Sequence, residues 1–514
     1  MKAGAEALHM AIIVLALMLM FAQPAGAEPF TPGQGLDQRM IAEVTGAALA
    51  FMAPRTLEAI PTGQLTIWGL RGLTTLDQRL VASLSDRQLD LSLSGRMLLA
   101  RPPPMADPAS WGDAVAQLSR TAWDVSEAVR HAGTEGVLHS FFDELFNHLD
   151  PYSRYASPQE AAQEQARRNG SAGLGLDIAR NGPGFTVRAV LPGSPAAQAG
   201  IKPGETLSAI DGLQISGADL AAVSALLAGP EDSRVSLTLR GAGRSERVID
   251  LVRAVLTPVT VFSQRQGDLL VIRITGFARD TAELLAREIT RGVNTSKPPK
   301  GLVLDLRDNR GGLLRQAVSA AQTLAPLGLI AITAGRAPDA THEYRANGSD
   351  LAHGLPVVLV VDGRTASAAE VLAAALSDQR RAVVVGSATL GKGLVQTILP
   401  LPNGGALSLT WSRVLAPLGW PLQALGVLPQ VCTSLGEDAL RHNLAELALG
   451  RQPMARPLTR SRTARAPMPP AEILEIRNAC PASEGRDSDM AAAKFLIDTP
   501  MAYETALITP PPAP

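Results

Sequence analysis

The 514-residue sequence predicts an α/β protein of several domains, whose main domain contains a largely parallel sheet. A chain of this length exceeds what one hydrophobic core serves, since domains usually hold about 100–200 residues. From about Val259 onward, apolar runs typical of strands alternate with segments of helical spacing, and strands connected through helices pair in parallel. Residues 168–254 instead carry short alternating strands with glycine and proline turns, which indicates a small β-rich domain inserted before the α/β core.

Residues 1–27 have the pattern of a secretory signal peptide. Lys2 precedes an unbroken apolar run from Met10 to Ala22, and Ala25-Gly26-Ala27 follows as a small-residue cleavage site. The run is shorter than the ~20 residues that cross a bilayer as a helix, which favours cleavage over a permanent anchor. We therefore expect a periplasmic or secreted protein, with an uncleaved N-terminal anchor as the alternative. No later segment of the sequence is long and apolar enough to span a membrane.

Charge and cysteine content limit the partners of the chain. The 47 lysines and arginines nearly cancel the 48 aspartates and glutamates, so no basic field favours nucleic acid. The 2 cysteines offer too few ligands for a zinc site, and no His-Glu-x-x-His motif occurs, so we predict no metal and no cofactor. In an oxidising compartment Cys432 and Cys480 either form a disulfide that staples the C-terminal segment to the core or remain free thiols.

Residues 28–167 predict a largely helical N-terminal region, although the part before Arg101 carries no recognisable motif. Apolar residues at helical spacing run from Trp111 to Leu149. Ser157-Pro158-Gln159-Glu160 combines a capping box with a proline at the first helical position, which predicts the start of another helix. We interpret the apolar stripe as a core face, and its members are Val137, Leu138, Phe141, Leu145 and Leu149.

In the core, residues 255–433, strands and helices are expected to alternate along the chain. The C-terminal extension, residues 434–514, loses that order. Within the extension, Arg451–Pro470 is rich in arginine and proline, which predicts a flexible basic linker. The expected core strands are Leu269–Thr275, Leu302–Leu306, Pro356–Val361 and Ala382–Val385, and the expected helices are Glu283–Val293, Leu313–Leu324 and Ser367–Leu376.

Ser367 is a candidate nucleophile. It follows the apolar strand that ends at Val361 and stands at the start of an alanine-rich helix. A hydroxyl at such a strand-to-helix junction sits on a sharp turn, and the free N–H groups of the helix start can stabilise an oxyanion that forms beside it. The alternative is an ordinary serine at a helix N-cap.

Lys392 is a candidate general base. It stands between two glycines, after the apolar strand that ends at Val385. A lysine drawn into an apolar pocket has its charged form disfavoured, so its pKa falls and it can take a proton from a serine hydroxyl. The alternative is a solvated lysine in a turn. All 7 histidines lie outside residues 354–441, which leaves no sequence-local serine–histidine pair.

The turn at Gly311 and Gly312 is a third candidate element. It follows the apolar strand Leu302–Leu306 and precedes a segment of helical spacing. Two successive glycines at the end of a strand can present main-chain N–H groups to an anionic oxygen. Because such turns are common, this one supports a catalytic site only together with Ser367 and Lys392.

Taken together, these segments resemble the C-terminal processing peptidases, a family that includes bacterial tail-specific proteases. In that family a strand leads into a Ser-Ala-Ser-Ala-Ser-Glu-like stretch and then a Phe-Gly-Lys-Gly-like turn. The family's serine and lysine are 25 positions apart, as Ser367 and Lys392 are. The resemblance covers about residues 135–431. Ala369 and Leu390 depart from the usual pattern, which leaves substrate preference open.

The resemblance implies a role for each site residue. Ser367 is implied as the nucleophile, Lys392 as its general base and Gln396 as the residue that orients the lysine. The implied oxyanion hole consists of the main-chain amides of Gly311, Gly312 and Ala368.

The glycine-containing loop Gly173–Leu176 precedes a strand, and with it residues 168–254 resemble a PDZ domain. A PDZ domain binds a peptide as an added strand at its sheet edge, while a glycine-rich loop holds the terminal carboxylate. Here the loop that resembles this carboxylate-binding element consists of Gly173, Leu174, Gly175 and Leu176.

The two resemblances imply a crotonase-like spiral core with an inserted PDZ domain, a helical N-terminal region and a C-terminal extension. We predict a serine-type endopeptidase that cleaves near the C-terminus of exported proteins, with protein tails as its binding partners. A catalytically silent peptide-binding scaffold is the first alternative, which the presence of Ser367, Lys392 and Gln396 disfavours. An acyl-CoA enzyme is the second, which the signal peptide disfavours. We leave open whether an adaptor or a homo-oligomer takes part.

Overall fold

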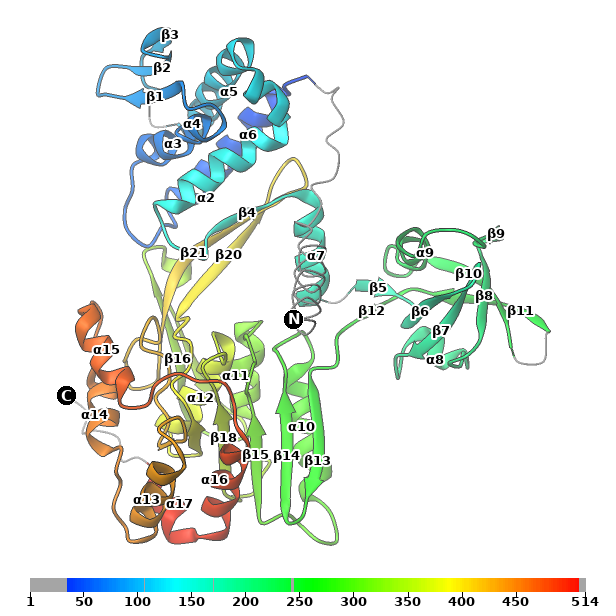
Figure 1. The fold of residues 1–514 in the computed structure, drawn as a ribbon, viewed down its shortest axis with the longest axis vertical. Helices are drawn as coiled ribbons and strands as arrows, with labels where there is room; N and C mark the ends of the chain where they lie inside the picture. Colours follow the sequence, from blue (N-terminus) through cyan, green and yellow to red (C-terminus); the bar gives the residue numbers. More distant parts are fainter. Residues whose placement is uncertain (1–34, 106, 170, 242–244, 508–514) are drawn as a thin grey trace, which may run out of the picture.

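The computed structural model describes residues 35–105, 107–169, 171–241 and 245–507 (Figure 1). These residues form an N-terminal unit, a separate β-rich unit, a central α/β core and a set of C-terminal helices against the core. The predicted signal peptide lies outside the described residues. None of the described helices is both long enough and apolar enough to cross a membrane.

The N-terminal unit combines helices with a small antiparallel sheet. Its sheet was not expected, because its strands hold only five or six residues and are partly exposed. The predicted apolar stripe is confirmed as a core face, since Val137, Leu138, Phe141 and Leu145 are buried together. The elements are α2 (Gln38–Met52), α3 (Thr62–Leu70), α4 (Gly72–Leu76), β1 (Leu80–Leu84), β2 (Leu89–Leu93), β3 (Arg96–Arg101), α5 (Pro108–Val125) and α6 (Glu127–Asn147).

A short passage of chain leads from the N-terminal unit to the β-rich unit. It contains β4 (Arg154–Ala156) and α7 (Pro158–Asn169). The capping box predicted for α7 is confirmed: the N–H of Ser157 donates to Glu160 Oε2 at 2.9 Å, and the N–H of Glu160 donates to Ser157 Oγ at 3.4 Å. These bonds satisfy donors that the first turn of a helix otherwise leaves unpaired.

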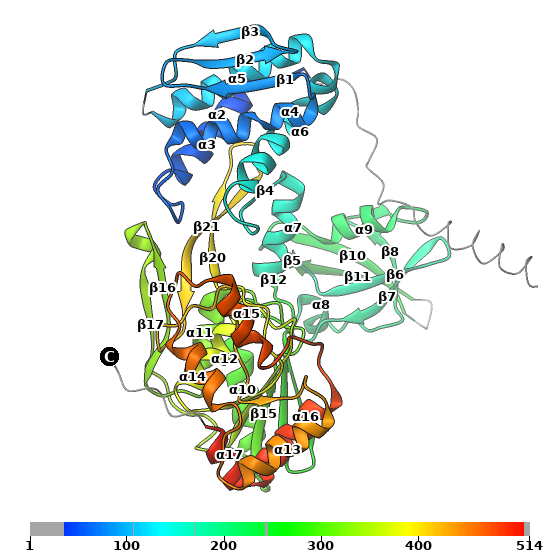
Figure 2. The same ribbon diagram turned by 60° about the vertical axis from the view of Figure 1, so that its left-hand side comes forward.

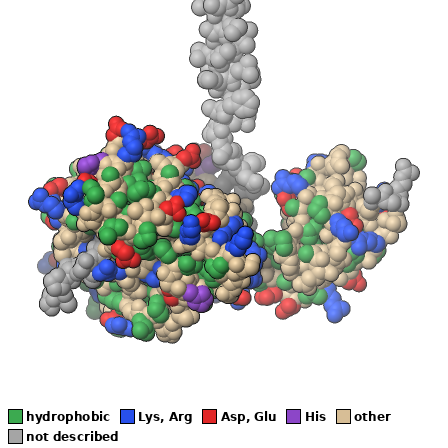
Figure 3. Space-filling view, turned by 90° about the horizontal axis from the view of Figure 1, so that it is seen from below, with side chains coloured by type: hydrophobic (Ala, Val, Ile, Leu, Met, Phe, Trp, Pro, Cys, Tyr) green, Lys and Arg blue, Asp and Glu red, His purple; other side chains and the backbone are tan. Residues whose placement is uncertain are grey.

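The β-rich unit is an antiparallel sheet with two short helices and its own apolar core, and Figure 3 shows it as a lobe beside the main body. A two-stranded ribbon of β5 (Ser171–Gly173) and β12 (Ala254–Leu256) connects it to the rest of the chain. The sheet path is β11-β10-β8-β7-β6, with β9 beside β8, so β6 is an edge strand. The elements are β6 (Leu176–Asn181), β7 (Gly184–Val190), α8 (Pro195–Gln198), β8 (Thr206–Ile210), β9 (Leu213–Gln214), α9 (Leu220–Leu227), β10 (Arg234–Arg240) and β11 (Glu246–Val252).

The core is built on a sheet with the order β13-β14-β15-β18-β19-β22. Pairing is parallel from β14 to β22 and antiparallel only between β13 and β14, which confirms the predicted parallel pairing. The strands and their helices are β13 (Val261–Gln266), β14 (Leu269–Ile274), α10 (Thr281–Val293), β15 (Gly301–Asp305), α11 (Leu314–Gln322), β18 (Val357–Val361), α12 (Ala368–Asp378), β19 (Val383–Gly386) and β22 (Val431–Cys432).

Alternate residues of the core strands serve two apolar layers. In β18, Val357 and Leu359 pack with α10, α11 and α12, whereas Val358 and Val360 pack with the C-terminal helices. Successive strand residues point to opposite faces, so a sheet covered on both faces needs continuous apolar strands. All five residues of β15 and of β18 are buried for this reason.

A second, smaller sheet joins the core to the N-terminal unit. Its long hairpin of β20 and β21 reaches the N-terminal helices (Figure 1), and Leu407 and Leu409 of β21 are buried in their core. The strand order is β17-β16-β21-β20, and β4 also pairs with β21. The elements are β16 (Gly328–Gly335), the 3-10 helix η1 (Pro338–Ala340), β17 (His342–Ala346), β20 (Leu394–Pro400) and β21 (Ala406–Leu415).

The helices described for the C-terminal extension, α13 to α17, pack on the core (Figure 2). Three of them, α13, α16 and α17, cover the second face of the central sheet. The other two, α14 and α15, add Leu458 and Ile476 to the first apolar layer. Their bounds are α13 (Glu437–Ala448), α14 (Ala455–Thr463), α15 (Pro470–Asn478), α16 (Asp487–Asp498) and α17 (Pro500–Ala506).

The prediction of a flexible linker over Arg451–Pro470 is wrong. This segment contains α14, and its Arg462 is 3% exposed. Arg462 Nε lies 2.8 Å from Asp378 Oδ1 at the end of α12, and the Trp420 indole donates to the other oxygen at 2.8 Å. Burial raises the pKa of the Asp378 carboxyl, and the guanidinium opposes that shift. One arginine of this arginine-rich segment, Arg462, is therefore the buried ion-pair partner of Asp378.

Replacing Arg462 with alanine is expected to destabilise the protein strongly. The change leaves the Asp378 carboxylate buried without its cation, which costs about 3–5 kcal/mol when one partner of a buried pair is removed. Chemical denaturation measures the loss. The matched control is Arg460→Ala on the same helix, whose pair with Glu475 is exposed, and it is expected to leave stability nearly unchanged. Equal losses in the two variants would contradict the assigned role of Arg462.

Candidate active site

Ser367 lies on a strained turn between β18 and α12, residues Asp362–Ser367, which we call the serine turn. Its backbone has φ 58° and ψ −120°, whereas an ordinary N-cap residue has β-region angles. A non-glycine residue in such a region costs about 1–3 kcal/mol and persists only where its surroundings hold it. Ser367 thus occupies the N-cap position, but its backbone angles differ from those of an ordinary N-cap serine.

Glu370 joins the serine turn to the segment around Lys392, residues Ser387–Gly393, which we call the lysine turn. Its fully buried carboxylate accepts the N–H of Ser367 at 2.7 Å, of Gly391 at 2.7 Å and of Lys392 at 2.9 Å. The Thr389 hydroxyl is a fourth donor. Burial raises the pKa of Glu370, and these four bonds oppose the shift. One carboxylate therefore ties the candidate nucleophile to the candidate base.

Sequence reasoning missed this role of Glu370. Glu370 has no assigned role in the sequence analysis. The available signal was its place three residues after a serine N-cap, the spacing of a capping box. In the folded chain the glutamate serves the helix start and the lysine turn together.

Ser367, Lys392 and Gln396 line one cavity of about 320 Å³, together with Gly312 and Ala368. The structure thus brings together predicted residues from four segments of the core. The apolar part of the lining comes from α11, α12, β20 and β21, and includes Leu314, Val371, Leu394, Val395 and Val414. Within the described ranges, no group of three or more His, Cys, Asp or Glu side chains is placed to hold a metal ion.

The glycine turn approaches Ser367 so closely that no side chain fits. A Cβ on Gly311 would lie 2.8 Å from Ser367 Cβ, and one on Gly312 would lie 2.2 Å from the carbonyl oxygen of Phe277. The N–H of Gly311 already donates to Asn309 Oδ1 at 2.8 Å. Of the three amides expected in the oxyanion hole, that of Gly311 is therefore committed elsewhere.

The predicted peptide-binding loop lies in the β-rich unit, outside the active-site cavity. Gly173 ends β5 and pairs with Ala254 of the connecting ribbon, and Leu176 begins the edge strand β6. Leu174 is buried, and its carbonyl accepts the N–H of Ala196 at 3.0 Å. Gly175 has φ 78°, and a Cβ there would lie 2.2 Å from Ser194 Cβ. The loop is therefore held against the start of α8.

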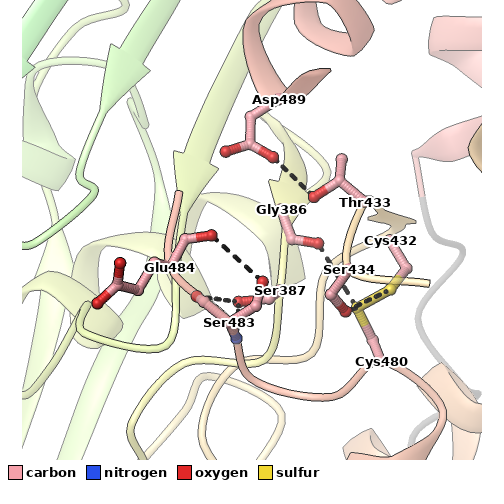
Figure 4. The surroundings of a disulfide bond; sticks show 9 residues. All are labelled: Gly386, Ser387, Cys432, Thr433, Ser434, Cys480, Ser483, Glu484 and Asp489. Carbon is pink, nitrogen blue, oxygen red and sulfur yellow. Dashed lines mark hydrogen bonds between the residues drawn. A yellow bond between two sulfur atoms is a disulfide. The ribbon is translucent and has the colours of Figure 1, made fainter. Parts of the chain in front are cut away.

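Cys432 and Cys480 form a disulfide, which settles the alternative left open by the sequence. Beyond it, the segment Cys480–Glu484, which we call the strap, bonds to both turns, and Figure 4 shows its contact with Ser387 of the lysine turn. The carbonyl of Ser483 accepts the N–H of Gly363 in the serine turn at 2.7 Å and the Ser387 hydroxyl in the lysine turn at 3.0 Å. The C-terminal extension therefore braces the two turns from outside the cavity.

Two family descriptions match this chain. Residues 268–433 match peptidase family S41, and residues 186–241 match the PDZ domain. The first match spans the cavity, including Ser367 and Lys392, and the second falls on the β-rich unit.

Curated relatives extend the similarity beyond these two segments. The chain is 35% identical over 314 residues to the carboxy-terminal-processing protease of Bartonella bacilliformis, covering 58% of this chain and 72% of the relative. It is 32% identical over 327 residues to the chloroplastic C-terminal processing peptidase of Tetradesmus obliquus, covering 56% and 69%. Among solved structures, a photosystem II D1 C-terminal processing protease aligns at 27% identity and TM-score 0.36, over 73% of this chain and 98% of that one.

Replacing Glu370 with glutamine is expected to lower the free energy of unfolding. The new amide NH₂ faces groups that themselves donate, and each buried donor left without an acceptor costs about 1–3 kcal/mol. Thermal and chemical denaturation measure the change. Glu343→Gln, on the exposed face of β17, is the control and is expected to behave as the parent. Unchanged stability of the Glu370 variant would contradict the bridging role.

Reducing the disulfide is expected to lower the melting temperature. The bridge closes a loop of 48 residues, which corresponds to about 4 kcal/mol of restricted chain entropy in the unfolded state. Thermal unfolding with and without a thiol reductant measures the shift. A variant with serine in place of both Cys432 and Cys480 should melt at the lower temperature in both conditions. A reductant effect of equal size on this variant would show that the shift does not come from the bridge.

Proposed function

The chain belongs to peptidase family S41, among the carboxy-terminal processing proteases. From this we propose that it is a serine endopeptidase that acts through a Ser367–Lys392 dyad. The observation that carries this proposal is the Glu370 bridge, which holds the serine turn and the lysine turn together at one cavity. Two turns so joined allow nucleophile and base to act on the same substrate atom.

In the proposed mechanism, Ser367 Oγ attacks the carbonyl carbon of a peptide bond while Lys392 accepts its proton. The carbonyl oxygen becomes an oxyanion near the amides of Gly312 and Ala368, because the amide of Gly311 is committed to Asn309. Lys392 then donates the proton to the leaving amine as the C–N bond breaks. Water hydrolyses the acyl-enzyme and restores the Ser367 hydroxyl.

We propose that the β-rich unit recognises the C-terminal tail of the substrate. Its strand β6 lies at the sheet edge directly after the loop Gly173–Leu176, and α9 lies beside it. An extended peptide can add to such an edge while the loop amides bind its terminal carboxylate. The substrates are therefore protein or peptide C-termini, cleaved at an internal bond near the end.

Two further proposals concern the compartment of the protein and the fold of its core. Export of the chain is supported by the signal-peptide pattern over residues 1–27 and by the Cys432–Cys480 disulfide, since disulfides persist in oxidising compartments. A crotonase-like arrangement of the core is supported by its parallel strands joined through helices.

Ser367→Ala and Lys392→Ala test the proposal. On an unfolded protein with an apolar C-terminus, each variant is expected to cleave at least about 10³-fold more slowly than the parent, because the nucleophile and its base act as a unit. Gel and mass analysis of the products measures cleavage. Lys300→Ala, an exposed lysine far from the cavity in the fold, is the control.

The same experiment separates the alternatives. Undiminished cleavage by both alanine variants would contradict the dyad. A parent protein that binds the C-terminal peptide but cleaves nothing would favour the catalytically silent scaffold. Amidation of the peptide's C-terminus should weaken binding if the loop holds a carboxylate, and unchanged binding would contradict that role of Gly173–Leu176.

A further inference from the structure

Gln396 is the end of a hydrogen-bonded chain that leaves the active-site cavity. Its Nε2 donates to the hydroxyl of Thr410 on the neighbouring strand β21 at 3.1 Å. The Thr410 hydroxyl in turn donates to Asp150 Oδ1 at 2.8 Å. Gln396 and Thr410 are directly paired residues of β20 and β21, so the first bond follows from the strand register. Asp150 belongs to a segment about 260 residues away in sequence.

The Asp150 carboxylate fixes the direction of every bond in this chain. An ionised carboxylate only accepts hydrogen bonds, so the Thr410 hydroxyl must donate to it. The hydroxyl oxygen is then the acceptor for Gln396, which must present its NH₂ group rather than its carbonyl. The remaining end of the amide, Oε1, is consequently the end that can accept a hydrogen bond from the side-chain nitrogen of Lys392.

Hydrogen bonds within the turn hold the Asp150 carboxylate in place. Asp150 accepts the N–H of Tyr152 at 2.9 Å and both the N–H and the hydroxyl of Ser153, at 3.0 and 2.6 Å. The Ser153 hydroxyl also accepts the N–H of Thr410 at 2.9 Å. Thr410 is thus bound to this turn through its main chain and its side chain.

The same turn contacts the catalytic lysine directly. Lys392 Nζ lies 4.6 Å from the centroid of the Tyr152 ring, a distance at which a cation is attracted to the ring face. The residues Asp150–Ser153 therefore approach both Lys392 and the glutamine that serves it. They also lie between α6 of the N-terminal unit and β4, at the passage toward the β-rich unit.

We propose that Asp150 and Thr410 are positioning residues of the dyad: they set the orientation of the Gln396 amide so that its oxygen faces Lys392. The inference rests on the proposed function of Ser367 and Lys392. It makes Thr410 a contributor to the acylation step, although Thr410 does not line the cavity. It also makes the lysine's surroundings depend on the segment that directly follows the N-terminal unit.

Thr410→Val and Thr410→Ser form the test pair. Valine has the shape of threonine but no hydroxyl, so the Gln396 amide loses its direction, and kcat for a peptide substrate is expected to fall about 10-fold with KM unchanged. Serine keeps the hydroxyl and is expected to restore kcat to within about two-fold of the parent. Ser408→Ala is the matched control, because Ser408 lies on the same strand and its buried hydroxyl has no hydrogen-bond partner among the described residues.

A double-mutant cycle with Gln396→Ala distinguishes positioning from general destabilisation. If Thr410 acts only through Gln396, adding Thr410→Val to Gln396→Ala should change kcat no further. If the fold losses of kcat in the two single variants multiply in the double variant, the inference is overturned. Parent-like kcat in Thr410→Val would also overturn it, as would a failure of serine to restore kcat while all variants melt at the parent's temperature.

The failure of this inference is distinct from the failure of the proposed function. Activity that survives in Ser367→Ala would contradict the dyad itself, and with it any positioning of Lys392. Activity lost in Ser367→Ala but retained in full in Thr410→Val would leave the dyad standing and contradict only the role of Thr410 and Asp150.

Discussion

The arrangement of this protein's active site depends on one buried carboxylate. Glu370 has no exposed surface, and a charge in such a place is tolerated only where hydrogen bonds surround it. Its four donors come from the serine turn and the lysine turn, so moving either turn away would leave the carboxylate incompletely bonded. The position of Ser367 relative to Lys392 is therefore a consequence of satisfying Glu370, and the strained backbone of Ser367 is sustained by the same bonds.

The sheet topology makes that bridge geometrically accessible. β18 and β19 are neighbouring parallel strands, so the turns that follow them emerge at the same edge of the sheet. The glycine turn after β15 emerges there as well, since β15 pairs in parallel with β18. Glycine at residue 311 lets this third turn approach Ser367 to a distance that any Cβ would prevent, and glycine at residue 312 lets it pass equally close to the Phe277 main chain. The cavity is thus the meeting point of three consecutive strand ends.

Segments outside the core reinforce these turns from two sides. On one side the strap bonds to both turns through Ser483, and the disulfide anchors it. On the other side the Asp150–Ser153 turn contacts Lys392 through Tyr152 and reaches Gln396 through Thr410. The segment that follows the N-terminal unit and the C-terminal extension therefore both contact a site whose lining residues all belong to the core.

The sequence by itself determined the order of the core elements, because apolar periodicity reports directly which residues a strand or helix buries. It also predicted Ser367 and Lys392 as a pair, because the family resemblance rests on their separation of 25 positions, and the same resemblance added Gln396. The tertiary structure alone decided the partners of the charged and polar groups: Glu370 with Lys392, Asp378 with Arg462, and Asp150 with Thr410. These partners are 22, 84 and 260 residues apart, and no local pattern encodes which distant donor will satisfy a carboxylate that folding buries wholly or in part.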